Sequence, residues 1–196
     1  MKTTIDAQPH PGQLEVHNSD ARFKVLSAGR RWGKTRLGVN ECLDAAAQGG
    51  RAWWVSPSYK TSEVGWRPLR QIASKIPNAE IRLADRMVTL PGGGFVAVRS
   101  ADNPDSLRGE GLDYVVMDEC AFMQKEAWTE AIRPALSDRQ GKALFISTPK
   151  GRNWFWETTS AASMVKRAGN RGHSRLHRIR TFRQAKLRRR GVTCLR

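Results

Sequence analysis

The chain has 196 residues, a formal net charge of +16 and 39% hydrophobic residues. This length is typical of one domain with a buried core, and no run of about 18 apolar residues predicts a membrane span. The N-terminus lacks the apolar segment of a secretory signal, and the three cysteines are too widely spaced for a metal motif, so a reducing cytosol is the expected compartment.

The positive charge is concentrated toward the C-terminus. Residues 151–196 contain 13 Lys and Arg residues against one acid, a net charge of +12, whereas residues 1–150 contain 21 against 17, a net charge of +4. A strongly basic chain ordinarily indicates a nucleic-acid partner. Here that interpretation depends on whether the basic tail is a folded part of the protein.

The N-terminal segment, up to about Asp20, is polar. Pro9, Pro11 and Gly12 predict a loop that enters a short helix. Gln13 lies in this segment, about twenty residues before a glycine-containing turn. Two interpretations stay open for Gln13: a solvated polar side chain, or the glutamine that reads adenine in ATPases related to helicases.

The first predicted strand leads into that turn. Residues 23–26 have strand character, residues 27–35 read SAGRRWGKT, and apolar side chains recur at helical spacing over residues 36–43. Strand, turn and helix in this order form the context of a phosphate-binding P-loop, G-x-x-x-x-G-K-S/T, in which Ala28 replaces the first glycine. The alternative is a chance turn before a helix.

Three residues of the turn carry the expected chemistry. Gly33 lets the backbone approach closely, so that successive N–H groups bind a phosphate at the helix N-terminus. Lys34 would reach the β- and γ-phosphates, and Thr35 would hold Mg²⁺. The motif therefore predicts a site for a nucleoside triphosphate with its metal ion.

Strands and helices alternate from this turn to about residue 150, which predicts an α/β fold with a mainly parallel sheet flanked by helices. A turn at residues 91–94 joins two of the strands and indicates a small β-hairpin inserted in the alternation. The expected helices cover residues 34–48, 62–76 with an interruption at Pro68, and 124–137, and the expected strands cover residues 52–57, 80–83, 87–90, 95–99, 112–117 and 142–146.

Polar residues follow two of the apolar strands. Asp118 and Glu119 end the strand at 112–117, and because the carboxyl ends of parallel strands face the ligand crevice, Asp118 would help to hold Mg²⁺ and Glu119 would activate a water. The alternative is a strand that ends in two solvated acids. Ser147 and Thr148 end the next strand, where they would sense the γ-phosphate or act as ordinary turn formers.

Three segments together resemble a known family. GRRWGKT at residues 29–35, SLRGEGLDYVVMDECAFM at 106–123 and ISTPKGRNWF at 146–155 are similar, in order and spacing, to the ATPase domain of the large terminase subunit of tailed bacteriophages. The resemblance covers about residues 9–157. It implies a P-loop NTPase fold of the additional-strand, catalytic-glutamate type and an ATPase that powers viral DNA packaging into the procapsid.

The resemblance also implies roles for individual residues. Asp118 and Thr35 would bind Mg²⁺, Glu119 would be the catalytic acid, and Arg108 would be an arginine finger that reaches a neighbouring subunit, or else an ordinary surface arginine. Ser147 and Thr148 would couple hydrolysis to DNA movement. Arg30 and Arg31 would act in catalysis near the γ-phosphate, and the residues implied to bind ATP are Gln13, Ala28, Gly29, Arg30, Arg31, Trp32, Gly33, Lys34 and Thr35.

The partners implied by the resemblance are double-stranded viral DNA, the small terminase subunit and the portal protein. The chain would act in the cytoplasm of the bacterial host, without a membrane, as a ring-type homo-oligomer on the portal. The nuclease domain of the family is not expected in this chain. The alternative function is an inactive prophage remnant that binds nucleic acid through its basic tail.

The expected domains are an ATPase domain at residues 1–157 and a basic tail at residues 158–196. The tail has too few hydrophobic residues to fold alone and is expected to be disordered. A shifted reading frame over part of it can encode W-E-S-W-A-F-P-T-S-P-N-P-Y-L, which resembles terminase sequence. We therefore interpret the tail as the product of a frameshift, and a genuine basic arm is the alternative.

Overall fold

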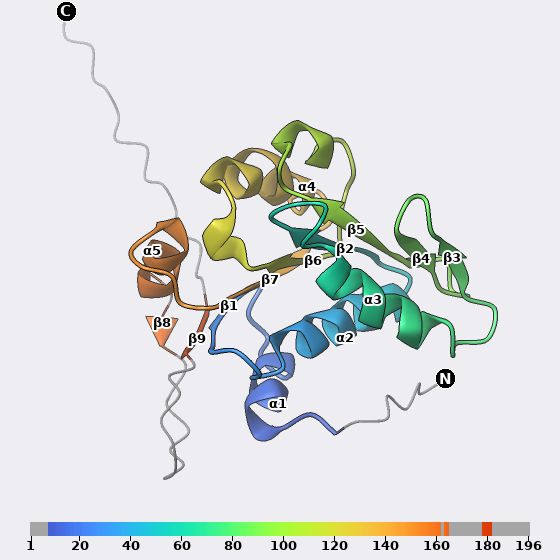
Figure 1. Cartoon of the computed structure of the whole chain (residues 1–196), viewed down its shortest axis with the longest axis horizontal. Helices are drawn as coiled ribbons and strands as arrows, with labels where there is room; N and C mark the ends of the chain where they lie inside the picture. The colour runs from blue at the N-terminus through green and yellow to red at the C-terminus, as the bar shows by residue number, and fades with distance from the viewer. Residues whose placement is uncertain (1–7, 162, 165–177, 182–196) are drawn as a thin grey trace, which may run out of the picture.

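The structure is a computed structural model that describes residues 8–161, 163–164 and 178–181 (Figure 1). A mixed β-sheet lies between two layers of helices. The helices α1 (Pro11–His17), α2 (Lys34–Ala47) and α3 (Glu63–Ala73) cover one face. The other face carries the short helices η1 (Pro104–Leu107), η2 (Cys120–Phe122), η3 (Ala127–Ile132) and α4 (Arg133–Ala135), with α5 (Trp154–Ala161) beside them.

The sheet has the strand order β3-β4-β5-β2-β6-β7-β1-β9-β8. Its centre is parallel, and the antiparallel strands lie at the two edges, so the expectation of a mainly parallel α/β sheet is confirmed. The parallel strands are β5 (Phe95–Ser100), β2 (Arg51–Ser56), β6 (Tyr114–Asp118), β7 (Lys142–Ser147) and β1 (Phe23–Ser27). The antiparallel strands are β3 (Glu80–Arg82), β4 (Met87–Thr89), β8 (Ser163–Met164) and β9 (Arg178–Thr181).

One strand, β7, lies between the strand that precedes the P-loop and the strand that ends in two acids. It pairs in parallel with β1, with Ser27 opposite Ser147, and with β6, with Asp118 opposite Ile146. The carboxyl ends of β1, β7 and β6 are therefore level. This inserted strand is the feature that defines the additional-strand class of P-loop folds, as the resemblance to the terminase family implied.

The sheet separates two hydrophobic cores because successive side chains of a strand point to opposite faces. Trp54 and Val116 belong to the core beneath α2 and α3, whereas their neighbours Trp53 and Val115 belong to the core beneath η3 and α5. Both tryptophans are at most 2% exposed. Central strands that are apolar at every position, such as residues 52–55, can therefore be buried on both faces.

Three expectations about the elements need correction or refinement. The helix expected at 124–137 is present over residues 125–135, but its middle, Ala127–Ile132, is π-helical, and the three-residue α4 follows. The expected interruption at Pro68 is wrong, because α3 continues through it. The expected hairpin is present as β4 and β5, but β5 also pairs in parallel with β2, so the hairpin extends the main sheet.

The boundary expected after Glu157 falls inside α5. Beyond it, the structure describes the rest of α5 and the strands β8 and β9, and β9 pairs antiparallel with β1. The other residues of the expected disordered tail lie outside the described residues. Within the described ranges, no helix combines the length and the apolar character that a membrane span requires.

Candidate nucleotide site

Apart from Gln13 and Arg108, the predicted site residues come from three segments that meet at the carboxyl edge of the sheet. The P-loop follows β1, Asp118 and Glu119 end β6, and Ser147 and Thr148 end β7. The Ala28 amide donates to the Ser147 carbonyl at 3.2 Å, which joins the start of the P-loop to the end of β7. The edge that the sequence predicted as the ligand crevice therefore brings these groups together.

The backbone of the P-loop explains its glycine pattern. Gly33 has φ 92° and precedes the first residue of α2, a left-handed conformation that favours glycine. A Cβ at this position would also collide with the Gln13 amide. Ala28 is not among the residues with positive φ, so a side chain is tolerated where the motif usually has its first glycine.

Lys34 is folded back over the loop. Its Nζ donates to the carbonyl oxygens of Ala28 at 2.9 Å and Gly29 at 3.2 Å, and the side chain is 8% exposed. Burial lowers the pKa of Lys34, and the nearby carboxylates of Glu119 and Asp118 oppose this shift. A phosphate between the loop and the lysine would supply the strong anionic partner that two carbonyl groups do not.

Asp118 is a buried acid, only 5% exposed. Burial, together with the neighbouring Glu119 carboxylate, raises the pKa of Asp118 to about 7, although Lys34 lowers it. A carboxyl group whose ionised form is disfavoured beside another carboxylate is a fitting ligand for a divalent cation, which would offset both effects. Thr35, partly exposed in the first turn of α2, is the hydroxyl ligand that the motif predicts.

Glu119 has a strained backbone and a fixed carboxylate. Its φ of 47° and ψ of 43° are left-handed values that are uncommon for a residue with a side chain. Its Oε2 accepts hydrogen bonds from Ser147 Oγ at 3.1 Å, from the Thr148 amide at 3.2 Å and from Thr148 Oγ1 at 2.9 Å. The two residues expected to couple hydrolysis to movement therefore hold the expected catalytic acid directly.

Gln13 is buried, 5% exposed, so the solvated alternative is wrong. Its Nε2 donates to the Gly33 carbonyl at 3.1 Å, and its Oε1 accepts from the His10 amide at 3.1 Å. The His10 ring contacts the Trp32 ring edge-to-face, with centroids 4.6 Å apart. Helix α1 is thereby attached to the P-loop, and the reading of adenine by Gln13 stays a prediction.

The three arginines predicted to act in catalysis, Arg30, Arg31 and Arg108, have different surroundings. Arg30 and Arg31 are exposed on the P-loop, and Arg31 has a φ of 64°. Arg108, whose side chain is 54% exposed, forms ion pairs with Asp105 at 3.2 Å and Glu130 at 3.4 Å. These partners belong to η1 and η3, so in this chain the described ion pairs of Arg108 do not reach the P-loop.

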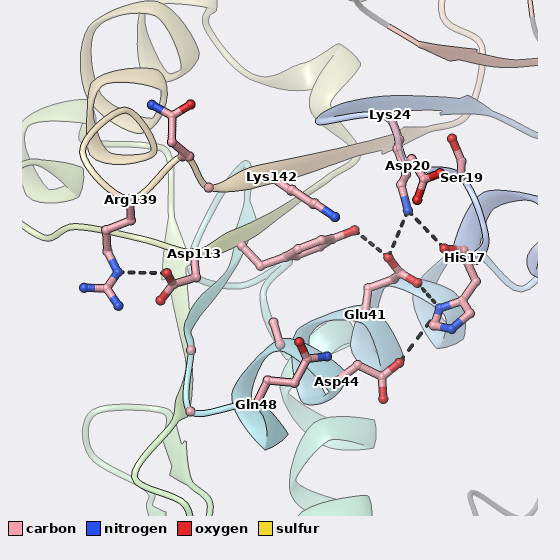
Figure 2. Close-up of a pocket in the computed structure, with 16 residues that line it drawn as sticks. His17, Ser19, Asp20, Lys24, Glu41, Asp44, Gln48, Asp113, Arg139 and Lys142 are labelled. Carbon is pink, nitrogen blue, oxygen red and sulfur yellow. Dashed lines mark hydrogen bonds and ion pairs between the residues drawn. The ribbon is translucent and has the colours of Figure 1, made fainter.

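The sequence analysis missed a second polar cluster, at the amino edge of the sheet (Figure 2). Glu41 of α2 accepts a hydrogen bond from Tyr114 Oη at 2.6 Å and lies 3.6 Å from Lys24 Nζ. His17 Nδ1 lies 2.6 Å from the other carboxylate oxygen of Glu41. The cluster borders a cleft of about 470 Å³ and joins α1, α2, β1 and β6.

Lys24 supplies Glu41 with a buried cationic partner. Glu41 and Lys24 are 6% and 4% exposed, and burial lowers the pKa of Lys24 while the Glu41 carboxylate opposes the shift. Glu41, His17 and Asp44 lie close enough to share a metal ion, but Lys24 already neutralises Glu41. Two features of the sequence could have indicated this cluster: Lys24 lies in an otherwise apolar strand, and Glu41 lies on the buried side of a helix.

The fold and the P-loop together define a P-loop NTPase of the additional-strand, catalytic-glutamate class. The chain also matches the family model described as terminase large subunit, T4likevirus-type, N-terminal, over residues 25–185. The chain belongs to this family of phage terminase large subunits. The match extends past Glu157, an observation that a frameshift beginning there would have to explain.

Individual relatives support the family membership. The large terminase subunit of Thermus virus P23-45 is 38% identical over 172 residues, covering 76% of this chain and 36% of the relative, and that of Escherichia phage T5 is 30% identical over 161 residues with the same coverage. This chain thus spans about a third of the length of these relatives. The large terminase ATPase domain of Thermus phage P74-26 superposes with a TM-score of 0.66 and 34% identity, covering 80% of this chain and 71% of that chain.

Proposed function

We propose that this chain binds Mg-ATP in its P-loop and hydrolyses it as the motor module of a phage terminase. The observation that carries the proposal is the Glu119 carboxylate, held by Ser147 and Thr148 at the carboxyl edge, two strands from the P-loop strand. The names of related structures support nucleotide binding in the family. They include the large terminase of bacteriophage D6E in complex with ADP and with ATP-γ-S, although at 17–18% identity they share only the fold with this chain.

The proposed reaction is attack of water on the γ-phosphate. Lys34 would exchange its two carbonyl partners for the β- and γ-phosphates, and the N–H groups after Gly33 would bind the same phosphates. Asp118 and Thr35 would hold Mg²⁺, which would offset the negative charge that develops on the leaving ADP. Glu119 would orient the attacking water and accept its proton as the bond between the β- and γ-phosphate breaks.

Gln13 would lie at the adenine, and Arg30 and Arg31 would lie near the γ-phosphate, where their exposure in the loop leaves them room to move. Arg108 would act on the nucleotide of a neighbouring subunit, because its described partners in this chain are two surface acids. That role requires a ring-type homo-oligomer. The partners we propose are double-stranded viral DNA, the small terminase subunit and the portal protein, in the cytoplasm of the bacterial host.

Two variants test the ATP site. Lys34→Ala should abolish most nucleotide binding in calorimetry, because the phosphates lose their buried cation. Glu119→Gln should bind ATP with little change and lose turnover, because an amide cannot accept the proton. The matched controls are Lys142→Ala and Glu126→Gln, which change exposed residues outside the carboxyl-edge site.

Unchanged ATP affinity in Lys34→Ala, or wild-type turnover in Glu119→Gln, would refute the assignment. The alternative of an inactive prophage remnant predicts a different result: salt-dependent DNA binding without ATP turnover in the unaltered chain. Measuring phosphate release with and without double-stranded DNA separates the two functions.

A further inference from the structure

The segment after Glu119 is attached to the start of α5 by two side chains. Asn153 Nδ2 donates to the Ala121 carbonyl at 3.1 Å, and Trp154 Nε1 donates to the Met123 carbonyl at 2.7 Å. The accepting carbonyls lie two and four residues after Glu119, within and just beyond η2. The backbone that carries the catalytic candidate is therefore fixed from the side of α5.

Both donors are themselves held in place. Asn153 Oδ1 accepts the amide of Trp156, which makes Asn153 the N-cap of α5, and its Nδ2 also donates to the Lys150 carbonyl at 3.0 Å. The Trp154 ring meets Phe145 of β7 edge-to-face at 6.5 Å. Any change in the direction of α5 would therefore move these donors relative to η2.

The same loop contacts Glu119 at its other end. Ser147 and Thr148 hold the Glu119 carboxylate, and Asn153 and Trp154 hold the segment that follows its backbone. Residues 147–154 thus enclose Glu119 from both sides. Its left-handed backbone persists only where the surroundings fix it, since such a conformation costs of order 1–3 kcal/mol.

We propose that Asn153 and Trp154 are positioning residues for Glu119, and that through them α5 moves together with the catalytic carboxylate. The inference rests on the proposed role of Glu119 in ATP hydrolysis. A change in the partner of the carboxylate, from Thr148 to the attacking water, would shift η2 and with it the first turn of α5.

The first test removes one donor and keeps the ring. Trp154→Phe loses the hydrogen bond to Met123 and retains an aromatic ring opposite Phe145, so kcat should fall about five- to tenfold, as expected when about one hydrogen bond in a positioning network is lost. The KM for ATP and the ATP affinity should stay within about twofold. The matched control is Trp128→Phe, which changes another ring that contacts Phe145, at 4.7 Å.

The second test separates the helix cap from the attachment to η2. Asn153→Asp keeps an oxygen that caps α5 and loses the amide donor to Ala121, so kcat should fall while thermal stability changes little. If Asn153 serves only as a cap, Asn153→Asp will turn over ATP at the wild-type rate. That result, or equal kcat values for Trp154→Phe and Trp128→Phe, would overturn the proposal.

Hydrogen exchange gives a readout that does not require turnover. Trp154→Phe should speed exchange of the Phe122 and Met123 amides, which bond within η2, and Glu119→Gln should change exchange of the Trp156 and Glu157 amides in α5. The inference would be refuted if Trp154→Phe left the η2 amides unchanged and Glu119→Gln left the α5 amides unchanged. If the unaltered chain hydrolyses no ATP, the proposed function fails, and the exchange measurements still decide whether η2 and α5 are coupled.

Discussion

Asp118→Asn should stabilise the folded chain at neutral and alkaline pH in the absence of metal and nucleotide. The folded chain keeps the Asp118 proton up to a pKa of about 7, whereas an ordinary Asp loses it near 3.8. Between these values the folded state binds more protons, so stability falls as the pH rises and the cost is fully present above about pH 7. The difference corresponds to about 4 kcal/mol, which an uncharged asparagine avoids.

The net gain is smaller because Lys34 loses a neighbouring carboxylate. Burial lowers the pKa of Lys34, and Asp118 is one of the two acids that oppose this. We therefore expect Asp118→Asn to gain about 2 kcal/mol at about pH 8 and almost nothing at about pH 4, because the wild-type carboxyl is then protonated in the folded chain. The same variant should lose Mg²⁺-dependent ATP turnover.

The assay is urea unfolding with a metal chelator, at several values between about pH 4 and about pH 8. The control is Asp113→Asn, for which we expect the opposite dependence of stability on pH. Burial alone would raise the pKa of Asp113, but hydrogen bonds from Arg139 and from the Arg51 amide lower it, so Asp113 stabilises the fold above its usual pKa and the contribution is lost as the pH falls. An Asp118→Asn variant that is less stable than wild type at about pH 8, or equally shifted at every pH, would refute the reasoning.

Three further variants test other parts of the structure. Arg108→Ala should lower turnover only at protein concentrations where subunits assemble, so a rate per subunit that depends on concentration in wild type and not in the variant is expected. Glu41→Gln should lower the free energy of unfolding by about 3–5 kcal/mol in urea, because it leaves Lys24 buried without its anion. Gly38→Ala should cost about 1–3 kcal/mol in the same measurement, because the added Cβ would lie 2.8 Å from Trp54 Cζ3.

The fold could be predicted in large part because its central strands are continuous apolar runs. The run at residues 143–146 has the same pattern as those at 52–55 and 114–117, and each lies in a buried parallel strand in the structure. The π-helical turn at Ala127–Ile132 could not be predicted, since its apolar spacing is also that of an ordinary helix. Neither could the pairing of β5 with β2, which depends on contacts far apart in the sequence.

The candidate site was also predictable only in part. Lys34, Asp118 and Glu119 were found from local patterns, because the ends of level parallel strands share one edge. The cluster around Glu41 was not found, since Tyr114 lies 73 residues further along the chain and no local pattern connects them. The structure also gives Gln13 a contact with the P-loop backbone that its position in the sequence did not reveal.

The two cores on opposite faces of the sheet hold the two sides of the candidate site separately. Lys34 begins a helix that packs in one core, whereas Glu119 is followed by Cys120 and Ala121, which pack in the other. A displacement of the Glu119 carboxylate relative to Lys34 would therefore involve the second core, in which Cys120, Ala121 and Phe155 are buried, and not the core beneath α2. The sheet separates the side of the site that contains Lys34 from the side that follows Glu119.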